Sequence, residues 1–365
     1  MSTPTDTVPV FSYESFVGVD IAAKTFTVAF ALGEGKPKLE KKPFEKNAEG
    51  FKQFLARLQA STIPPQHQLV VMEATGPYWL ALAITLTQAG YRVNVANPAQ
   101  VHYFAKAKLK RAKSDELDAQ TLAEFGQTKA MRLRLWSPPP QFYHELRQRI
   151  SQRESLLKFQ NQVENQLHAL TSGPVIIESV CQQLEELQRT LIAQIEQMDQ
   201  ELKSLIKAEL ADFEKLDEAL LTPEQLYKKN IALLRTIPGI GVMTACWLVL
   251  ATLNFTTCED AAALANYAGL APLEYSSGTS IRGRPQIGHS GQARLRTMLF
   301  MATLTAARYN PVIKVFYQRL REEKHKPSKV ARCACARKLI HLAFGIIKSR
   351  KPFEPDYHSG RQAAA

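Results

Sequence analysis

Two apolar runs that each end in a carboxylate constrain the fold of this sequence more than any other feature. Residues 16–19 are followed directly by Asp20, and residues 69–72 are followed directly by Glu73. Short, fully apolar runs of this kind are typical of buried strands. A charge that closes such a strand is only partly desolvated and needs a counter-ion. We therefore expect a sheet that gathers acidic side chains along one edge.

A second pair of acids, Asp115 and Asp118, follows Ser114, a favourable residue for capping a helix. Residues three apart share one face of a helix. Any one of the four acids alone would more often be structural, for example as a cap or as a partner of Lys24. Together they suit one or two Mg²⁺ ions, with Mn²⁺ as a second candidate, because these cations prefer oxygen ligands.

The first third of the chain alternates strands and helices, which predicts a mixed sheet with helices on its faces. We expect strands at residues 15–21, 25–31, 36–42, 68–72 and 91–95, the third of them at an edge. We expect helices at residues 48–58 and 76–90, and a further helix from residue 115. The run Trp-Ser-Pro-Pro-Pro at residues 136–140 ends this alternation. An α/β domain is therefore predicted at residues 12–135.

The next region, residues 140–215, predicts two long helices. In the second of them, apolar residues recur at steps of three or four with one extra step of four, the pattern of a coiled coil with a stutter. These residues are Val180, Leu184, Leu187, Leu191, Ile195, Met198, Leu202 and Leu205. Ser172, Gly173 and Pro174 separate the two helices, so we expect an antiparallel hairpin. The pattern leaves open whether the hairpin packs on itself or on another subunit.

Positive charge is concentrated near the end of the chain. The 365 residues carry a formal net charge of +12. Residues 275–353 contain 17 Lys and Arg against only Glu322 and Glu323, whereas the rest of the chain is close to neutral. A basic domain of this kind indicates polyanion binding, because several of its arginines alternate with glycine rather than pairing with acids. Nucleic acid is the expected partner; the alternative is a solvated surface that only aids solubility.

Two groups of basic residues are the predicted nucleic-acid contacts. Their members are Lys106, Lys108, Lys110, Arg111 and Lys113, and Arg282, Arg284, Arg294 and Arg296. The first group lies beside the second pair of acids, where it would bring a phosphodiester to the metals or offset the repulsion between the acids. The arginines of the second group suit phosphate oxygens, which guanidinium groups bind in bidentate fashion.

The C-terminal region, residues 228–355, is predicted to be mainly helical. Two helices are joined by Ile-Pro-Gly-Ile-Gly at residues 237–241. This turn resembles the helix-hairpin-helix motif, whose glycines let backbone amides approach a phosphate. It fits a plain helical corner equally well.

A serine in this region is a candidate nucleophile. Ser277 precedes Gly278 in a turn surrounded by arginines, where a hydroxyl could attack a phosphate. Ser-Gly is also ordinary turn chemistry. Ser276 beside it and Ser290 next to His289 are alternative candidates.

The five cysteines form no metal-ligand or disulfide pattern, so we expect ordinary buried thiols and a reducing, cytoplasmic setting. No apolar stretch is long enough to span a bilayer, and no signal peptide is visible at the N-terminus. We therefore expect a soluble protein with no membrane partner.

Taken in order, these motifs resemble one family. Gly-Val-Asp20-Ile-Ala, Met-Glu73-Ala-Thr-Gly-Pro-Tyr and Lys-Ser-Asp115 with Asp118 are similar to the RuvC-like domain of DEDD transposases of the Piv/MooV type. This family includes the bridge-RNA-guided insertion-sequence transposases. The later motifs Ile-Pro-Gly-Ile-Gly, Ser277-Gly, Arg-Gly-Arg and Leu-Arg296 resemble the C-terminal transposase domain of the same family. The resemblance spans residues 15–353.

The resemblance implies a fold and a mechanism. It implies a ribonuclease H-like (RuvC-like) first domain, in which the four acids hold metal, and a serine nucleophile at the position of Ser277. It also implies an active site shared between subunits, a dimer or tetramer, and association with the nucleoid. Donor DNA, target DNA and a noncoding guide RNA are the implied partners.

Two other functions compete with a serine transposase. One is a RuvC-like junction nuclease that hydrolyses DNA through metal-activated water alone. The other is a nucleic-acid-binding protein whose sheet domain is inactive, although this fits poorly with four intact acids.

Overall fold

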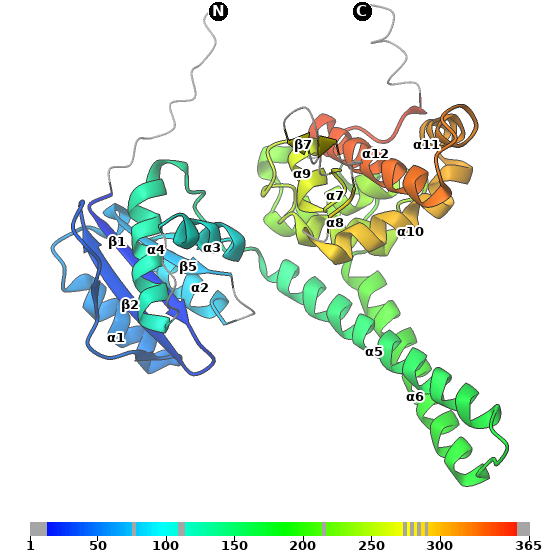
Figure 1. The fold of residues 1–365 in the computed structure, drawn as a ribbon, viewed down its shortest axis with the longest axis horizontal. Helices are drawn as coiled ribbons and strands as arrows, with labels where there is room; N and C mark the ends of the chain where they lie inside the picture. Colours follow the sequence, from blue (N-terminus) through cyan, green and yellow to red (C-terminus); the bar gives the residue numbers. More distant parts are fainter. Residues whose placement is uncertain are drawn as a thin grey trace, which may run out of the picture. The chain divides into compact units, whose positions relative to one another are not determined.

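A computed structural model of the chain describes residues 13–74, 78–108, 114–213, 217–272, 276–277, 281–282, 286–288 and 291–355. The chain divides into two compact units, Met1–Pro138 and Pro139–Ala365 (Figure 1). A mixed sheet with flanking helices forms the first unit, and the second is mainly helical, in agreement with the predicted classes. The predicted helix start at Gly76 and Pro77 lies outside the described residues.

The first unit is built on one sheet. Its strands are β1 (Ser15–Ile21), β2 (Thr25–Leu32), β3 (Lys38–Leu39), β4 (Phe44–Glu45), β5 (Gln68–Glu73) and β6 (Arg92–Ala96). They are ordered β3-β2-β1-β5-β6, with β4 also paired to β2. Strand β1 is antiparallel to β2 and parallel to β5, which is parallel to β6. The carboxyl ends of β1 and β5 therefore lie at the same edge of the sheet.

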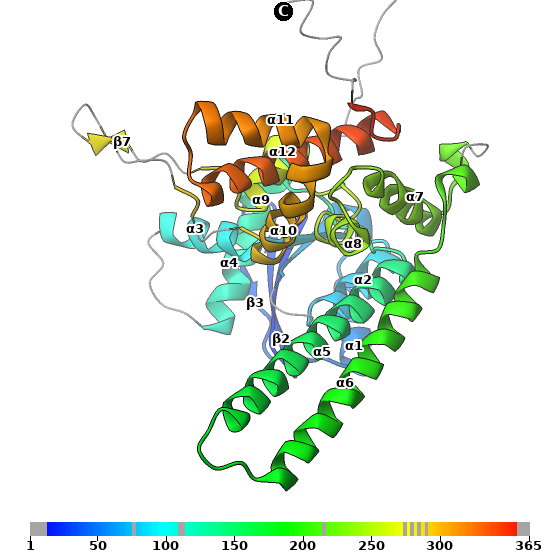
Figure 2. The ribbon, with the colours of Figure 1, turned by 90° about the vertical axis from the view of Figure 1, so that its right-hand side faces the viewer.

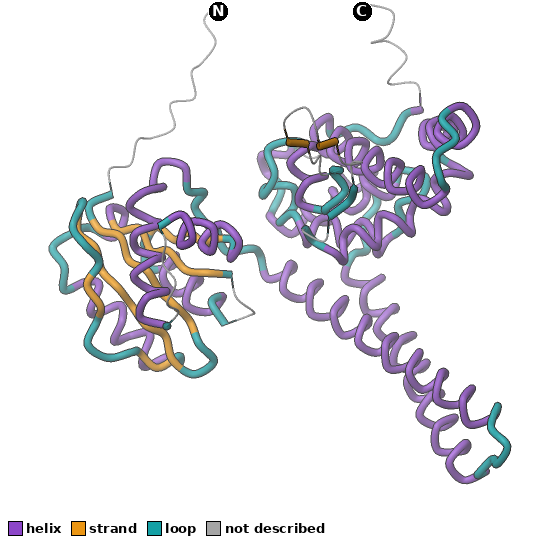
Figure 3. The backbone as a smooth tube through the Cα atoms, in the orientation of Figure 1, coloured by secondary structure: helices purple, strands orange, loops and turns teal. Residues whose placement is uncertain are grey.

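Helices cover both faces of this sheet. They are α1 (Ala48–Gln59), α2 (Leu80–Gln88), α3 (Pro98–Ala107) and α4 (Asp115–Lys129), with short turns η1 (Pro65–His67) and η2 (Ala130–Arg132). One buried cluster joins α1 and α2 to Val17 and Val19 of β1. A second joins α3 and α4 to Phe16 of β1 and Val71 of β5. Because side chains alternate along a strand, the two clusters lie on opposite faces of the sheet, whose strands are orange in Figure 3.

The elements of the first unit differ from the sequence prediction in three places. The third strand is shorter than residues 36–42, because only Lys38–Leu39 pairs with β2 and Pro37 has no amide to donate. Strand β4 has two residues, too few to give a recognisable period. Helix α3 is absent from the prediction, which expects no helix between the strand at residues 91–95 and the helix from residue 115. Asn97 in fact caps α3 by accepting a hydrogen bond from the amide of Ala99.

The segment that leaves the first unit runs along the edge strand β6. The amide of Trp136 donates to the carbonyl of Val93 at 2.7 Å. The side-chain amide of Asn94 donates to the carbonyl of Arg134, also at 2.7 Å. The Trp136 ring packs edge-on against Trp79, with 5.5 Å between ring centroids. These contacts fasten the end of the unit to its sheet.

Two long helices form a hairpin in the second unit. They are α5 (Gln141–Thr171) and α6 (Glu178–Leu205) (Figure 3). Leu156 and Val163 of α5 are buried against Leu191 and Ile195 of α6. The predicted antiparallel hairpin is confirmed, and its two helices pack on each other.

The remainder of the second unit is a helical bundle around one core. Its helices are α7 (Pro223–Arg235), α8 (Val242–Ala251), α9 (Ala261–Tyr267), α10 (Ala293–Tyr309), α11 (Pro311–Gln318) and α12 (Ser328–Ser349). Shorter elements are β7 (Ser276–Ser277), β8 (Ile281–Arg282), η3 (Leu210–Phe213), η4 (Glu218–Leu220) and η5 (Arg319–Glu323). Leu146 and Ile150, at the base of α5, belong to the same core as Leu248, Leu299 and Leu339. Figure 2 shows α10, α11 and α12 together in this bundle.

The turn between α7 and α8 is shaped by its packing on α10. Gly239 has φ +104°, and a Cβ at this position would lie only 2.5 Å from the Cβ of Ala306. Asn310 fixes the same turn by donating to the carbonyl of Pro238 at 3.2 Å. The close approach of α10 is sufficient reason for a glycine here. A phosphate-binding role for this turn stays a prediction.

The five cysteines are free thiols, and Cys181, Cys246 and Cys335 are buried. Burial raises the pKa of Cys335 to about 11, which keeps this thiol protonated and unreactive near neutral pH. In the described part of the chain, no helix combines the length and hydropathy needed to cross a bilayer.

Candidate functional site

Asp20 and Glu73 lie on the face of the sheet that α3 and α4 cover. Asp20 follows Phe16 by four residues on β1, and Glu73 follows Val71 by two residues on β5. Side chains an even number of residues apart on a strand share a face. Phe16 and Val71 are buried under α4, so both half-buried carboxylates lie at that face and at one edge of the sheet.

The position of α4 is set by a glycine on β1. A Cβ at Gly18 would lie 2.0 Å from the carbonyl oxygen of Ala119 and 2.3 Å from the amide nitrogen of Ala123. Near the other end of the helix, Gly126 packs against Phe16 and Val71. Helix α4 therefore lies directly on the strands and runs opposite to β1. Its first turn lies at the edge of the sheet where β1 ends.

The first turn of α4 carries the second pair of acids. Ser114 caps the helix, accepting a hydrogen bond from the amide of Leu117 at 3.3 Å. Asp115 and Asp118 follow it, and acidic residues are favourable here because the helix dipole is positive at this end. The cap, the dipole and the contact with Gly18 together place both aspartates toward Asp20.

The electrostatics of Asp20 reflect this gathering of charge. Its pKa is raised to about 6, first by burial and then by the carboxylates of Asp115, Asp118 and Glu73. Burial disfavours the charged form, and each neighbouring carboxylate disfavours it further. The structure thus brings the other three predicted acids within electrostatic reach of Asp20, although only Asp115 and Asp118 are close to each other in sequence.

The donor chemistry of these four residues fits a hard divalent cation. All are carboxylates, which Mg²⁺ and Mn²⁺ accept as ligands, and a cation would offset both the burial and the repulsion that raise the pKa of Asp20. Among the described residues, however, no group of three or more His, Cys, Asp and Glu side chains lies close enough to hold a metal ion. Metal binding by Asp20, Glu73, Asp115 and Asp118 therefore stays a prediction.

Substituting Gly18 by Ala should separate α4 from the sheet. The new methyl group would meet the helix backbone rather than a flexible side chain, so we expect a loss of about 3 kcal/mol in the stability of the first unit. Hydrogen exchange of the β1 and α4 amides in the full chain measures this loss. Gly33→Ala is the control: at φ +49° with no atom within 4 Å, it should cost only about 1 kcal/mol. Equal effects of the two substitutions would contradict the role of Gly18.

The first group of predicted nucleic-acid contacts is only partly described. Lys106 and Lys108 are exposed at the end of α3. Lys108 forms an ion pair with Glu124 of α4 at 2.9 Å and lies over the ring of Phe104. Lys110, Arg111 and Lys113 lie outside the described residues.

The candidate nucleophile belongs to the second unit. Ser277 is in β7, which pairs antiparallel with β8 in the register Ser277↔Ile281 and Ser276↔Arg282. Arg284 and Ser290 lie outside the described residues. The acids and this serine therefore come from different units of the chain.

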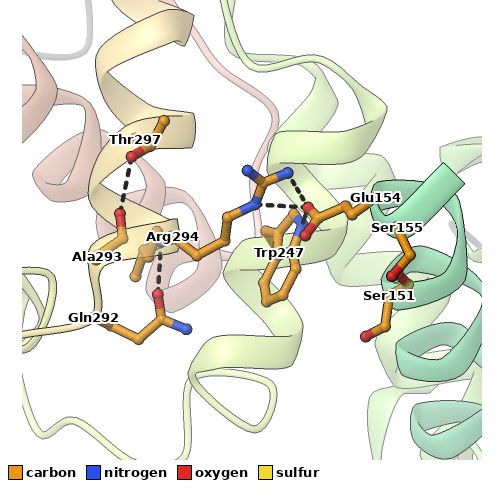
Figure 4. A network of polar contacts seen from close by, with 9 residues as sticks. Ser151, Glu154, Ser155, Trp247, Gln292, Ala293, Arg294 and Thr297 are labelled. Carbon is orange, nitrogen blue, oxygen red and sulfur yellow. Dashed lines mark hydrogen bonds and ion pairs between the residues drawn. The ribbon is translucent and has the colours of Figure 1, made fainter. Parts of the chain in front are cut away.

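Two further predicted contacts, Arg294 and Arg296, have partners within the second unit. Arg294, on α10, forms an ion pair with Glu154 of α5 (Figure 4). Glu154 also accepts a hydrogen bond from the indole nitrogen of Trp247, on α8, at 2.9 Å. Arg296 donates to the backbone carbonyls of Gly269 and Gly288. The sequence prediction misses Glu154 and Trp247, because no local pattern links residues so far apart.

Comparison with known proteins identifies the class of protein to which this chain belongs. Residues 17–173 match a family model described as a transposase, and residues 231–318 match that of the transposase IS116/IS110/IS902 family. The protein is therefore a transposase, an enzyme of DNA recombination, as the motifs predict. It belongs to the IS116/IS110/IS902 family of transposases.

Individual relatives agree with this assignment. The pilin gene-inverting proteins of Moraxella bovis and Moraxella lacunata are each 30% identical over 347 residues, which cover 94% of this chain and 99% of the relative. An uncharacterised 43.6 kDa protein of insertion element IS110 from Streptomyces coelicolor is 33% identical over 132 residues, 36% of this chain and 32% of that protein.

Proposed function

We propose that this transposase cuts and joins DNA through Ser277, with a divalent cation held by Asp20, Glu73, Asp115 and Asp118. The observation that carries the proposal is the packing of α4 on Gly18, which brings the first turn of α4 to the acidic edge of the sheet. Four carboxylates from two strands and one helix are difficult to explain as structural, because burial and the other three carboxylates raise the pKa of Asp20 instead of stabilising its charge.

The cation proposed is Mg²⁺, with Mn²⁺ as a substitute. When bound, it supplies positive charge that offsets the negative charge developing on the scissile phosphate. The strand order β3-β2-β1-β5-β6, a hairpin followed by parallel strands, supports a ribonuclease H-like assignment for this sheet.

The serine carries the covalent step. The Ser277 hydroxyl oxygen attacks the scissile phosphorus and loses its proton, while the bond from phosphorus to the leaving deoxyribose oxygen breaks and that oxygen takes up a proton. The resulting phosphoserine bond conserves the energy of the phosphodiester. A hydroxyl of the second DNA then attacks this bond, which joins the exchanged strands and releases the serine.

Assembly and partners complete the proposal. The proposed domains are residues 12–135, which carry the four carboxylates, residues 140–215, which form the hairpin, and residues 228–355, which carry the serine. A homo-oligomer, dimer or tetramer, would pair the acids of one subunit with the serine of another. A noncoding RNA from the flanks of the element would select donor and target DNA.

Proposed phosphate contacts lie on both units. They are Lys106, Lys110, Arg111, Lys113, Arg282 and Arg284. Contact of Lys108, Arg294 and Arg296 with nucleic acid stays a prediction, because all three have partners within the protein.

The experiment that tests this function looks for a covalent product. The protein, Mg²⁺ and RNA transcribed from the DNA flanking its coding sequence are incubated with labelled duplexes of the same flanks. We expect a protein–DNA adduct that survives denaturing electrophoresis and that disappears when RNA or Mg²⁺ is omitted. Free 5′-phosphate ends without an adduct would instead identify a junction nuclease that uses water. Mg²⁺-independent gel shifts without any product would identify a binding protein.

A further inference from the structure

The segment between α9 and α10, which carries Ser277, has its two ends held together. Gly291, with φ +98°, lies so close to Gly269 that a Cβ would be 2.6 Å from the Gly269 amide nitrogen. The amide of Gln292 donates to the carbonyl of Tyr267 at 2.7 Å. Only glycine allows this approach at a positive φ. The chain therefore leaves α9 and returns to α10 at one point.

Arg296 bonds to both ends of this segment. Its Nη1 lies 3.4 Å from the carbonyl oxygen of Gly269, which precedes the serine, and 3.3 Å from that of Gly288, which follows it. A single guanidinium nitrogen thus ties the outgoing chain to the returning chain. The guanidinium is planar and carries several fixed donors, so it holds two carbonyls in place better than an ammonium group.

The helix that carries Arg296 is itself anchored. Arg294, two residues earlier on α10, donates through Nε to Glu154 at 2.6 Å (Figure 4). The Glu154 side chain is only 14% exposed, and it also accepts the hydrogen bond from Trp247. A charge-assisted contact whose carboxylate is mostly buried resists displacement more than a fully exposed ion pair does. The start of α10 is therefore fixed to α5 and α8.

We propose that Arg296 is a positioning residue for Ser277: held on an anchored helix, it fixes both ends of the serine-bearing segment and thereby sets where the hydroxyl meets the scissile phosphate. This inference rests on the proposed function of Ser277. A nucleophile displaced by about 1 Å loses about 100-fold in rate. Because Arg296 acts through the backbone of Gly269 and Gly288, its loss affects the rate of attack rather than DNA binding.

The test separates rate from affinity. Arg296→Ala is compared with Arg308→Ala, which removes the same charge from the exposed last turn of α10. Adduct formation is followed with the labelled flanking duplex and its RNA at saturating duplex concentration, and the dissociation constant of the duplex is measured separately. We expect Arg296→Ala to lower the saturating rate about 100-fold. Its dissociation constant should match that of Arg308→Ala.

The conservative variant Arg296→Lys provides a second test of the proposal. Arg296→Lys keeps the charge and one donor group but not the planar fork of donors, so its rate should lie about 10-fold below that of the native protein and above that of Arg296→Ala. If Arg296→Ala lacks a native melting transition, the rate of Arg296→Lys alone tests the proposal. A native rate would overturn the proposal, whereas a rate reduced about 10-fold at unchanged affinity would support it.

Other outcomes would contradict either the positioning role of Arg296 or the proposed function of Ser277. A defect confined to affinity, with the salt dependence of binding reduced by about one unit, would make Arg296 a phosphate contact and overturn its positioning role. Equal rates for Arg296→Ala and Arg308→Ala would also overturn it. Ser277→Ala is measured in parallel: an adduct that persists in that variant refutes the proposed function itself.

Discussion

Replacing Ser277 by Ala is expected to abolish the covalent protein–DNA product and strand joining, with a loss of at least about 10⁴-fold in rate. The substitution removes the oxygen that attacks phosphorus, and a methyl group cannot replace it. Ser277 pairs with Ile281 through its backbone, so alanine keeps the β7–β8 ladder. DNA binding, measured by gel shift with the labelled duplex, should stay near the native value.

The neighbouring serines are the matched controls for this prediction. Ser276→Ala changes the adjacent residue in the same strand, and Ser290→Ala changes the serine beside His289. Both should retain the adduct. Persistent recombination in Ser277→Ala would refute the assignment, and a lost adduct in one control alone would move the nucleophile to that position.

Replacing Asp118 by Asn should remove metal-dependent cleavage, with a loss of about 10³-fold or more in rate. The amide has nearly the shape of the carboxylate, so helix α4 should keep its position on Gly18. It lacks the negative charge, however, and Asp118 is one of the carboxylates that raise the pKa of Asp20. Cleavage of the labelled duplex is measured over a range of Mg²⁺ concentrations.

A neighbouring acid in the same helical turn tests whether the effect is specific. Glu116→Gln removes an identical charge from the first turn of α4, but Glu116 is exposed and does not contribute to the shifted pKa of Asp20. It should cleave at close to the native rate. Full activity of Asp118→Asn, or an equal defect in Glu116→Gln, would contradict the metal site.

The fold of the first unit was largely readable because its signals are local. The runs before Asp20 and Glu73 are apolar throughout, and β1 and β5 are central strands buried on both faces. The hairpin was readable for a similar reason, since a regular apolar step over many residues defines a packed helix pair. Helix α3 was not predicted, because its first residues, Asn97 and Pro98, are equally compatible with the end of a strand.

The candidate site, like the fold, could be predicted only in part from the sequence. Sequence reasoning finds the four acids by their places at the ends of elements. It does not predict that Gly18 allows α4 to pack on the sheet, because this role depends on a helix about a hundred residues further along the chain. The bonds from Arg296 to Gly269 and Gly288 are equally invisible, since an arginine in a basic region suggests phosphate rather than a backbone carbonyl.

The segment that ends in Trp136 matters for anyone who produces the sheet unit alone. Strand β6 is the last strand of its sheet, and the residues from Arg134 to Trp136 lie along it. A truncation before Arg134 would uncover this strand together with the apolar ring of Trp79. Uncovered edges invite pairing with other chains. A fragment that stops short of Trp136 would thus tend to precipitate for reasons unrelated to catalysis.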